Sequence, residues 1–474
     1  MQAVRLSAIA MIAALFLFNP FLRAADIFVT TNIQIAIDTA SSGDVIHLAA
    51  GKYPEILTIS NKNLSLVGTG TNCVIYNYQT NPVPLISITG PATVTLSNFQ
   101  LIGGWYQSWW TSSDWYEGYS PLGILSSNAN LTLNSLAINQ IGNFFVTVWN
   151  GSLFATNMGL WTYPFLAQCD IGLELDNCVA AIDGLTQDAG LIDHTINING
   201  YSSAFSDVTV VNSRIRASQL TWGNCVRTYV NSKLVVTNCN LYRGTDTNES
   251  VITAAPQMHD GVGIFGYSNN VVVAGNVMSN LPWAMYCCGS IGGNQVRVEC
   301  NSIFNSLFGG VFIDGMSYKG LDLGGGALGS RGGNLFSQSP QASTNYCDDV
   351  LLTNLNGLCT ANLFALHNTW SNPTNKEAVI YDKLDNPAFG RLITDDLTIT
   401  PAGKDAAGRP VISWNERGAG ESYTVQMCGS LAGGNWTNAP GSWPVTNPGL
   451  GNMCWTNPAK ISSNTFCRIR SLVP

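Results

Sequence analysis

One short segment of this chain gathers the side chains that best suit sugar recognition. Between residues 105 and 119, seven aromatic rings and two carboxylates occur within fifteen residues that also include Ser and Gly. Aromatic rings stack on the apolar faces of sugar rings, and carboxylates accept hydrogen bonds from sugar hydroxyls. The segment is therefore predicted to be a glycan platform; the alternative is that it folds down and buries its rings. Its residues are Trp105, Tyr106, Trp109, Trp110, Asp114, Trp115, Tyr116, Glu117 and Tyr119.

A second segment holds three acidic residues, Asp183, Asp188 and Asp193, followed by His194. Clustered carboxylates suit calcium, which takes roughly six to eight oxygen ligands. The spacing matches no recognised calcium-binding loop, so solvent-exposed loop acids are the favoured interpretation. Calcium is the one metal that the sequence suggests, as the alternative, and no other cofactor is indicated.

A third segment ends in His259-Asp260-Gly261, just before a strand-like run. A His–Asp pair would supply general-base chemistry, because imidazole titrates near neutral pH. Asp-Gly before a strand is also ordinary turn chemistry, with Gly at a positive φ. The basic residues of the middle of the chain, among them Arg227 and Arg243, would serve a lyase as bases or charge stabilisers, but none lies in a lyase-like motif.

A glycoside hydrolase needs converging carboxylates, held roughly 6.5–9.5 Å apart in inverting enzymes. The adjacent acids Asp348-Asp349 and Asp395-Asp396 occur only late in the chain. The residues alone therefore leave the question of enzymatic activity open.

Eight short strand-like segments repeat along the chain and would position these groups. Each ends at its fifth residue in a small or polar side chain, and the steps between those residues are 37, 22, 20, 35, 26, 37 and 25. Steps of 20 to 26 suit one coil of a β-solenoid, and longer steps suit a coil with an inserted loop. The segments are VTLSN (94–98), LTLNS (131–135), LFATN (153–157), LELDN (173–177), VTVVN (208–212), LVVTN (234–238), VVVAG (271–275) and VRVEC (296–300).

This alignment makes a geometric prediction. Stacked strands lie about 4.8 Å apart, so side chains at one corner of successive coils would form a vertical row and hydrogen-bond one another. Cys178 and Cys239 follow two of the segments at the sixth position and are predicted to be stacked, buried thiols. The predicted row contains Asn98, Asn157, Asn177, Asn212 and Asn238.

Composition agrees with a stack of coils. Only 11% of the 474 residues are charged, against about 25% in ordinary domains. Glycine is frequent (47 residues) and hydrophobic content is 46%, which argues against disorder. The 13 cysteines show no metal-binding spacing and are read as structural.

Residues 1–25 have the pattern of a secretion signal: a short basic start, an apolar run over 6–18 and small residues for cleavage. That run is shorter than the roughly 20 residues of a membrane span, and no later segment spans either. Loss of Arg5 and Arg23 with the signal takes the net charge from −8 to −10. Such an acidic chain should not bind nucleic acid through general electrostatics.

Two regions carry a family resemblance. The first runs from Ile33-Gln34 and Ala36-Ile37-Asp38 through Ser42-Gly43-Asp44 to Gly51-Lys52-Tyr53-Pro54-Glu55. The second comprises 321–330, Gly332-Gly333-Asn334, His367-Asn368-Thr369-Trp370 and 380–387. The chain resembles right-handed parallel β-helix proteins of the pectate-lyase-like group, secreted by bacteria. The resemblance implies an all-β, three-sheet solenoid over about 26–400, plugged by an N-terminal helix and closed by the second region.

The composition changes after residue 400. Pro401, Gly403, Gly408 and Pro410 indicate a linker over 401–410. The alternation in 411–474 then predicts short antiparallel strands and resembles a small C-terminal β-sandwich module.

Together these features predict a secreted or cell-surface protein, monomeric, that binds extracellular polysaccharide. One alternative is a polysaccharide lyase or glycoside hydrolase. Another is a non-enzymatic surface or adhesion protein with a stiff solenoid. Fold alone does not decide among them.

Overall fold

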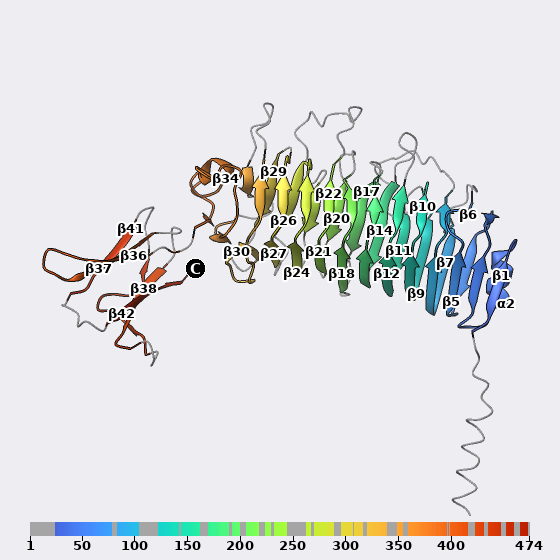
Figure 1. Cartoon of the computed structure of the whole chain (residues 1–474), viewed down its shortest axis with the longest axis horizontal. Coiled ribbons are helices and arrows are strands. Elements are labelled where there is room, and N and C mark those ends of the chain that lie inside the picture. The colour runs from blue at the N-terminus through green and yellow to red at the C-terminus, as the bar shows by residue number, and fades with distance from the viewer. Residues whose placement is uncertain are drawn as a thin grey trace, which may run out of the picture. The chain divides into compact units, whose positions relative to one another are not determined.

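The protein is almost entirely β-structure in its computed structural model (Figure 1). Its strands belong to two compact units. One comprises the described residues up to Glu174 together with Cys178–Ala181, and the other comprises Leu175–Asn177 and those from Ile182 on. The structure describes residues 24–77, 83–103, 122–141, 144–161, 169–188, 192–199, 205–217, 223–228, 232–243, 262–266, 270–288, 295–306, 308–315, 320–338, 348–353, 359–395, 397, 399–415, 422–430, 435–446, 452–458 and 465–472.

In both units the strands form three parallel ladders, as the solenoid prediction requires. The first ladder contains β4 (Leu57–Ser60), β7 (Ile86–Ser97), β9 (Leu122–Asn134), β11 (Phe144–Trp149), β14 (Cys169–Asp176), β17 (Ile192–Asn199), β20 (Asn224–Thr228), β23 (Val262–Gly266), β26 (Trp283–Cys288), β29 (Gly309–Asp314), β32 (Asp348–Thr353) and β34 (Ile380–Tyr381). The long strands β7 and β9 continue around a corner and also belong to the second ladder.

The second ladder contains, besides β7 and β9, β1 (Asp26–Val29), β2 (Val45–Leu48), β5 (Leu64–Gly68), β12 (Ser152–Thr156), β15 (Val179–Asp183), β18 (Ser206–Val211), β21 (Ser232–Thr237), β24 (Asn270–Ala274), β27 (Val296–Glu299), β30 (Leu321–Gly324), β33 (Leu363–Ala365) and β35 (Leu392–Ile393). The third contains β3 (Gly51–Tyr53), β6 (Cys73–Tyr76), β8 (Gln100–Ile102), β10 (Ala137–Asn139), β13 (Gly159–Trp161), β16 (Thr186–Gln187), β19 (Arg214–Arg216), β22 (Asn240–Tyr242), β25 (Val277–Ser279), β28 (Ser302–Phe304) and β31 (Leu335–Ser337).

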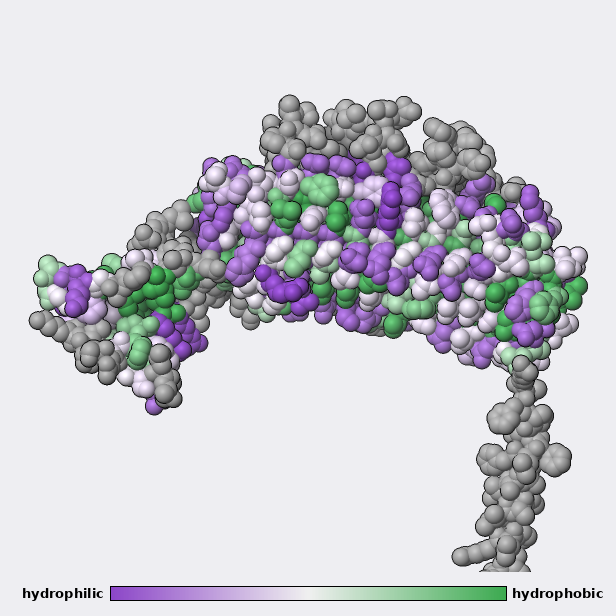
Figure 2. All heavy atoms as spheres, viewed as in Figure 1, coloured by the Kyte–Doolittle hydropathy of each residue, from purple (hydrophilic) through white to green (hydrophobic). Residues whose placement is uncertain are grey.

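The core consists of aliphatic columns, because alternate residues of each strand point inward. In the first unit Leu64, Val94, Leu131 and Leu153 are register partners in successive coils, and all are buried. The same column position in the second unit holds Val208, Leu234, Val271 and Val296. Hydrophilic and hydrophobic residues are interspersed over the visible outer face of the coils (Figure 2).

The corner after the second ladder confirms seven of the eight aligned segments. Their fifth residues all have φ between 50° and 68°, the left-handed region in which Asn and Gly are favoured. Asn238 donates to Asn212 at 2.6 Å, and Asn212 donates to Asp183 at 2.8 Å. The seven residues are Asn98, Ser135, Asn157, Asn212, Asn238, Gly275 and Cys300.

The placement of Asn177 in this row was wrong. LELDN belongs to β14 of the first ladder, so Asn177 follows that ladder, as Asn61 and Asn150 do. The second-ladder corner of this coil is instead Gly184, with φ 72°. The stacking of Cys178 on Cys239 was wrong for the same reason: both thiols are buried, but they follow different corners.

A helix packs at the first coil. In α2 (Ile33–Thr39) the apolar residues Ile33, Ala36 and Ile37 are buried. Both carboxylate oxygens of Glu55 accept hydrogen bonds from its first turn, the Ile33 and Gln34 N–H groups, at 2.9 Å. These contacts hold α2 to the first coil; that it plugs the end of the solenoid stays a prediction.

The second resemblance region is built around buried acids. The Asp322 carboxylate accepts four backbone N–H bonds of 2.9–3.1 Å, from Gly324, Gly326, Leu328 and Ser330. It therefore fixes the course of the glycine-rich loop.

A second buried acid, Asp382, organises hydrogen bonds in the last coil. Asp382, fully buried, accepts hydrogen bonds from Leu384 N, Leu392 N and the Arg391 guanidinium, which also pairs with Glu377 in η1 (Lys376–Val379). Trp370 stacks on Phe336 with ring centroids 5.2 Å apart.

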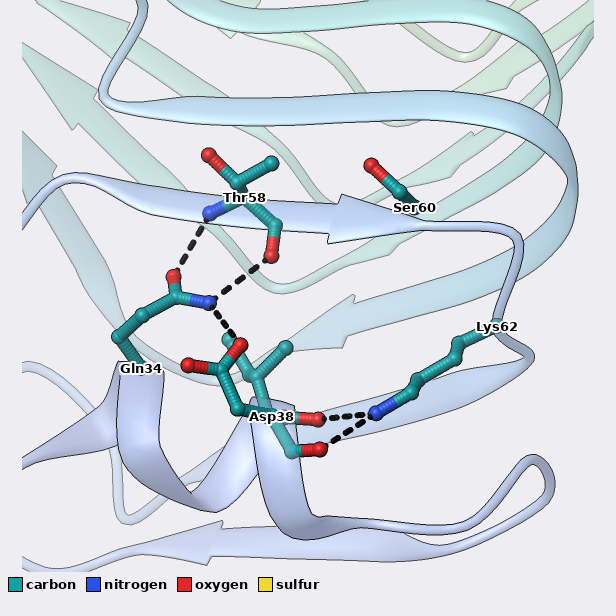
Figure 3. A pocket seen from close by; sticks show the side chains of 6 residues that line it. Gln34, Asp38, Thr58, Ser60 and Lys62 are labelled. Atoms are coloured by element: carbon teal, nitrogen blue, oxygen red, sulfur yellow. Dashed lines mark hydrogen bonds between the residues drawn. The ribbon is translucent and has the colours of Figure 1, made fainter.

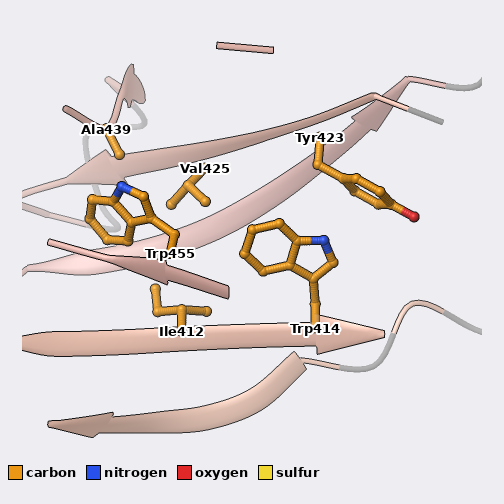
Figure 4. Close-up of a cluster of buried hydrophobic side chains, with 6 residues drawn as sticks. All are labelled: Ile412, Trp414, Tyr423, Val425, Ala439 and Trp455. Atoms are coloured by element: carbon orange, nitrogen blue, oxygen red, sulfur yellow. The ribbon is translucent and has the colours of Figure 1, made fainter. Parts of the chain in front are cut away.

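Two antiparallel sheets follow. One contains β36 (Ile399–Lys404), β37 (Pro410–Asn415) and β41 (Asn452–Thr456). The other contains β38 (Ser422–Cys428), β39 (Thr437–Asn438), β40 (Val445–Thr446) and β42 (Phe466–Leu472). They share a core of Ile412, Trp414, Tyr423, Val425, Ala439 and Trp455 (Figure 4).

The predicted linker needs correction. Residues 401–404 belong to β36, which pairs with β37, so only the turn before Pro410 connects the two strands. That 411–474 behaves as a separate domain stays a prediction. In the part of the chain that is described, no helix has the length and apolarity to cross a membrane.

Candidate carbohydrate-binding site

The predicted aromatic platform, 105–119 with Asp114 and Glu117, lies outside the described residues, as do His259 and Asp260. The described strands on either side of the aromatic segment in the sequence are β8, which ends at Ile102, and β9, which begins at Leu122. These two strand ends lie at the corner between the third and first ladders.

Trp161, the last residue of β13, is at this same corner. Its register partner is Asn139, and the partner of Asn139 is Ile102. At the usual spacing of stacked strands, Trp161 lies roughly 10 Å from the point where the aromatic segment leaves the third ladder. The indole thus belongs to the same edge of the first unit.

The orientation of the Trp161 ring follows from its neighbours. Leu160 is buried in the core, so Trp161 points outward, and 39% of its surface is exposed. A Cβ at Gly159 would overlap the indole, which shows that the ring lies flat over this glycine. One face of the ring packs on the sheet, and the other is presented at the surface.

Amide side chains accompany the ring. Asn139 and Gln140 are half-buried, and the backbone N–H of Gln140 donates to the Trp161 carbonyl at 3.2 Å. The Asn139 carbonyl accepts from Gly103 N at 3.0 Å, which ties the corner of one coil to the next. The arrangement offers an aromatic face beside hydrogen-bonding amides on a rigid backbone, the chemistry that a sugar ring requires.

The predicted calcium ligands have separate side-chain partners. Asp183 ends β15 and accepts from Asn212, whereas Asp188, after β16, bonds Tyr242 and lies 3.2 Å from Arg214 Nε. Burial, reinforced by Asp188, raises the pKa of Tyr242. Asp193 belongs to β17. Over the described ranges, no three His, Cys, Asp or Glu residues form a group able to hold a metal.

The two basic candidates lie on different ladders. Arg227, in β20, donates through Nη1 to Nε2 of buried His194 at 2.7 Å. Arginine has only donors, so this imidazole nitrogen is the acceptor. Arg243 follows β22 of the third ladder and is buried, with its backbone N–H bonded to Ser279.

Two of the adjacent acids near the end of the solenoid, Asp349 and Asp395, have partners within the protein. Burial raises the pKa of both Asp348 and Asp349 to about 6. Asp349 is fully buried and accepts hydrogen bonds from the backbone N–H and hydroxyl of Ser371. Asp395 is paired with Lys376 at 2.5 Å, and Asp396 is outside the described residues.

A small depression at the first coil is a joint between elements (Figure 3). The Gln34 amide pairs with both backbone groups of Thr58, at 2.8 and 3.1 Å, as a neighbouring strand would. Lys62 Nζ donates to the Ile37 and Asp38 carbonyls at the end of α2. These side chains are occupied in holding the helix to β4.

Trp161 was not among the residues predicted from the sequence to bind a ligand. The signal present in the sequence is Gly159-Leu160-Trp161, with a buried Leu between an outward Gly and an outward Trp. It resembles other strand ends until the register places it beside the aromatic segment.

The fold defines the class of protein: a parallel β-helix. No protein-family model matches the chain, and no characterised protein matches it in sequence. Among solved structures, the family 28 exopolygalacturonase of Yersinia enterocolitica is similar at 13% identity and a TM-score of 0.46, over 71% of this chain and 79% of that chain. The catalytic domain of a GH87 alpha-1,3-glucanase, in complex with tetrasaccharides, gives 11% and 0.46, over 80% and 69%.

A tailspike protein of E. coli bacteriophage HK620 is similar at 10% identity and a TM-score of 0.42, over 95% of this chain and 85% of that chain. At these values the similarities assign neither a ligand nor an activity to this chain.

Proposed function

We propose that the protein is exported and binds an extracellular polysaccharide at the corner between the third and first ladders. The observation that carries the proposal is Trp161, an indole laid flat over Gly159 with an exposed face. It lies at the edge from which the aromatic segment 105–119 departs. The pattern of residues 1–25 supports export.

The charge of this part of the chain favours an uncharged polysaccharide. Between residues 26 and 181 the sequence has nine Asp or Glu residues, two Lys and no Arg. Such an excess of negative charge repels a polyanion, while stacking and hydrogen bonding to a neutral sugar are unaffected. Neutral glycans are therefore the proposed ligand class.

One aromatic contact contributes about 0.5–1.5 kcal/mol, which alone gives weak binding. Several contacts along a chain of sugars add up, and the aromatic segment would supply the further rings. Sugar binding without turnover is the function proposed. The alternatives remain a lyase or hydrolase and a purely structural surface protein.

The test is affinity electrophoresis of the full mature chain in gels containing neutral polysaccharides: a mixed-linkage β-glucan, a xylan and a mannan. Trp161→Ala should weaken binding about two- to tenfold. The matched control is Trp149→Ala. Trp149 is 44% exposed, but it is the last residue of β11, so it lies at the end of that strand opposite to the proposed corner. It should leave binding unchanged.

Reducing-end and ultraviolet absorbance assays on the same mixtures separate binding from hydrolysis and elimination. Sustained product formation would make the protein an enzyme. Equal binding by Trp161→Ala and the unmodified protein would remove this corner as the site. Absence of binding to every polysaccharide would favour the structural alternative.

A further inference from the structure

The four-stranded C-terminal sheet has one face in the hydrophobic core. On its other face, strand β42 is exposed, whereas Thr424, Gln426 and Cys428 of β38 are buried. Tyr423, Val425 and Ile469 point into the hydrophobic core. The alternate residues of β42, which are Phe466, Arg468 and Arg470, are exposed on the opposite face. Two guanidinium groups and an aromatic ring thus form a row along one strand, with about 7 Å between successive residues of the row.

The Arg468 guanidinium is held in place by its neighbours. Nε donates to the Gln426 side-chain oxygen at 2.9 Å, and Gln426 in turn donates to Asn438 at 3.2 Å. The guanidinium carbon lies 4.4 Å from the centre of the Trp436 ring. Because Gln426 is buried, these contacts fix the orientation of an otherwise flexible side chain.

The binding edge of Arg468 is left open. Its contacts within the described part of the chain use Nε and the flat face of the group, so the terminal N–H groups point away from them. A guanidinium presented in this way matches the two oxygens of a carboxylate, in parallel hydrogen bonds. Arg470, opposite Thr424 in the register, adds a second positive charge on the same face.

The charge of the region is opposite to that of the rest of the chain. Residues 411–474 contain four basic residues (Arg417, Lys460, Arg468, Arg470) and two acidic ones (Glu416, Glu421), a net charge of +2 where the whole chain has −8. The four strands of this sheet contain no Asp or Glu. Electrostatic complementarity therefore favours an anionic ligand here.

We propose that the exposed row of Phe466, Arg468 and Arg470 on β42 binds a carboxylate-bearing polysaccharide. The carboxylate of one sugar would pair with the Arg468 fork, an adjacent carboxylate would meet Arg470, and a sugar ring would pack on Phe466, which is 40% exposed. This site is distinct in surface and in ligand charge from the neutral-glycan corner at Trp161. It does not depend on that corner.

The experiment uses the full mature chain and sodium polygalacturonate as the probe, with dextran as the uncharged comparison, in affinity electrophoresis at low salt. Arg468→Gln should weaken polygalacturonate binding tenfold or more. Arg468→Lys keeps the positive charge but loses the paired N–H donors of the guanidinium, so its binding should lie between that of Arg468→Gln and that of the unmodified protein. Arg470→Gln, which removes an exposed side chain, should weaken binding by a smaller factor without affecting folding.

The charge-matched control is Lys404→Gln, an exposed lysine on β36 of the other sheet. It should leave polygalacturonate binding within twofold of the unmodified protein. Trp161→Ala should also leave it unchanged, while Arg468→Gln should leave neutral-glycan binding unchanged. Failure of this site and failure of the Trp161 corner are thereby distinguishable.

Three results would overturn the proposal. One is equal loss in Lys404→Gln and Arg468→Gln, which would mean general electrostatics. Another is binding to phosphatidylglycerol vesicles with none to polygalacturonate, which would mean a membrane surface. The third is unchanged polygalacturonate binding with self-association of Arg468→Gln on size exclusion, since charged residues also protect exposed edge strands from pairing.

Discussion

The side-chain amide of Asn301 donates through Nδ2 to Oδ1 of Asn334, 3.0 Å away, in the closed interior of the second unit. The same Asn334 oxygen also accepts the backbone N–H of Asn301 at 3.1 Å. Asn276 makes this pair of bonds to Asn301, and Asn334 makes it to Asn368. Four amides thus form a ladder, each one position after a left-handed corner residue. Asn276, Asn301 and Asn334 are buried, and Asn368 is half-buried.

This ladder predicts a large loss of stability for Asn301→Leu. The change removes the acceptor of two N–H groups of Asn276 and leaves them buried without a partner. At about 1–3 kcal/mol for each unsatisfied group, the free energy of unfolding should fall by roughly 3–5 kcal/mol. Denaturant unfolding of the variant measures the loss.

Asn240→Leu is the matched control, because Asn240 is exposed on the outer face of β22. It should change stability by less than about 0.5 kcal/mol. Similar losses in the two variants would mean that the buried ladder has no special weight.

The left-handed corners predict a stabilising substitution. Cys300 has φ 57° and is exposed, and a left-handed residue with a side chain costs about 1–2 kcal/mol. Cys300→Gly removes that strain at the expense of a more flexible unfolded chain, so a gain of roughly 0.5 kcal/mol is expected. The midpoint of thermal unfolding should rise.

Cys300→Ala keeps the strain and removes only the thiol. It should not raise the midpoint. A rise of the same size in both variants would trace the gain to the thiol and not to the backbone.

Asp322 is predicted to be essential for the glycine-rich loop. In Asp322→Ala four backbone N–H groups lose their acceptor, so we expect a loss of about 3–5 kcal/mol in denaturant unfolding. Asp322→Asn retains one acceptor oxygen and should lose less. Asp395→Ala, which removes an exposed acid, should stay within about 0.5 kcal/mol; a loss as large as that of Asp322→Ala would contradict the prediction.

Much of the register between coils can be predicted from local sequence patterns. Buried aliphatic residues at alternate positions, followed by Asn or Gly, mark a strand that reaches a corner. That signature placed 94–98, 131–135 and 153–157 in correct register with one another. It worked because each such strand must bury one face and then turn through the left-handed region.

The signature does not say which corner it marks. In LELDN, Leu173 and Leu175 are buried and Asn177 is left-handed, as in the other segments, yet the strand belongs to the first ladder. Both corners impose the same local requirement, so a short segment cannot distinguish them. Only pairing with the neighbouring coils, which is non-local, decides.

The buried amide ladder was missed for a related reason. Asn276, Asn301, Asn334 and Asn368 each follow a corner residue, where Asn is usual in turns. The steps of 25, 33 and 34 were the available signal. The burial of Asn276, Asn301 and Asn334 depends on successive coils stacking in register, because one Asn alone would be costly in the core.

The sequence suggested a kind of candidate site, which stays a prediction, and did not suggest the place that is now proposed. The aromatic composition of 105–119 indicated sugar binding, and this interpretation remains a prediction. Trp161 could not be recognised from the sequence, because it becomes a candidate only through its contact with Gly159 and its register with Ile102, two coils away. Likewise, Arg468 became a candidate only once the register placed it opposite Gln426.

The aromatic segment itself can be tested directly. Trp109→Ala combined with Trp110→Ala should weaken glycan binding tenfold or more if the rings contact sugar, with an unchanged melting temperature. If the rings instead pack against the coils, the same pair of changes should lower stability by several kcal/mol. Unchanged binding with a lower melting temperature would favour the buried alternative.

Asp348 gives a prediction with a defined pH dependence. Burial, with the charge of Asp385 acting in the same direction, raises the pKa of the Asp348 carboxyl from 3.8 to about 6. The folded state therefore holds this proton more tightly than the unfolded state. The resulting stability is complete below about pH 4 and is lost as the pH rises through about 6. Asp348→Asn carries no charge, so it should be more stable than the unmodified protein above that range.

Because Asp348 is only partly buried, solvent screening reduces the effect to about 1 kcal/mol at pH 7.5, falling to near zero at pH 4. Thermal unfolding of both proteins across this range measures it. Asp405→Asn is the control of opposite sign: hydrogen bonds from Arg409 lower the pKa of Asp405, so its loss should destabilise at pH 7.5 and matter less as the pH falls. A gain for Asp348→Asn that did not change with pH would mean that packing, and not the buried charge, sets its effect.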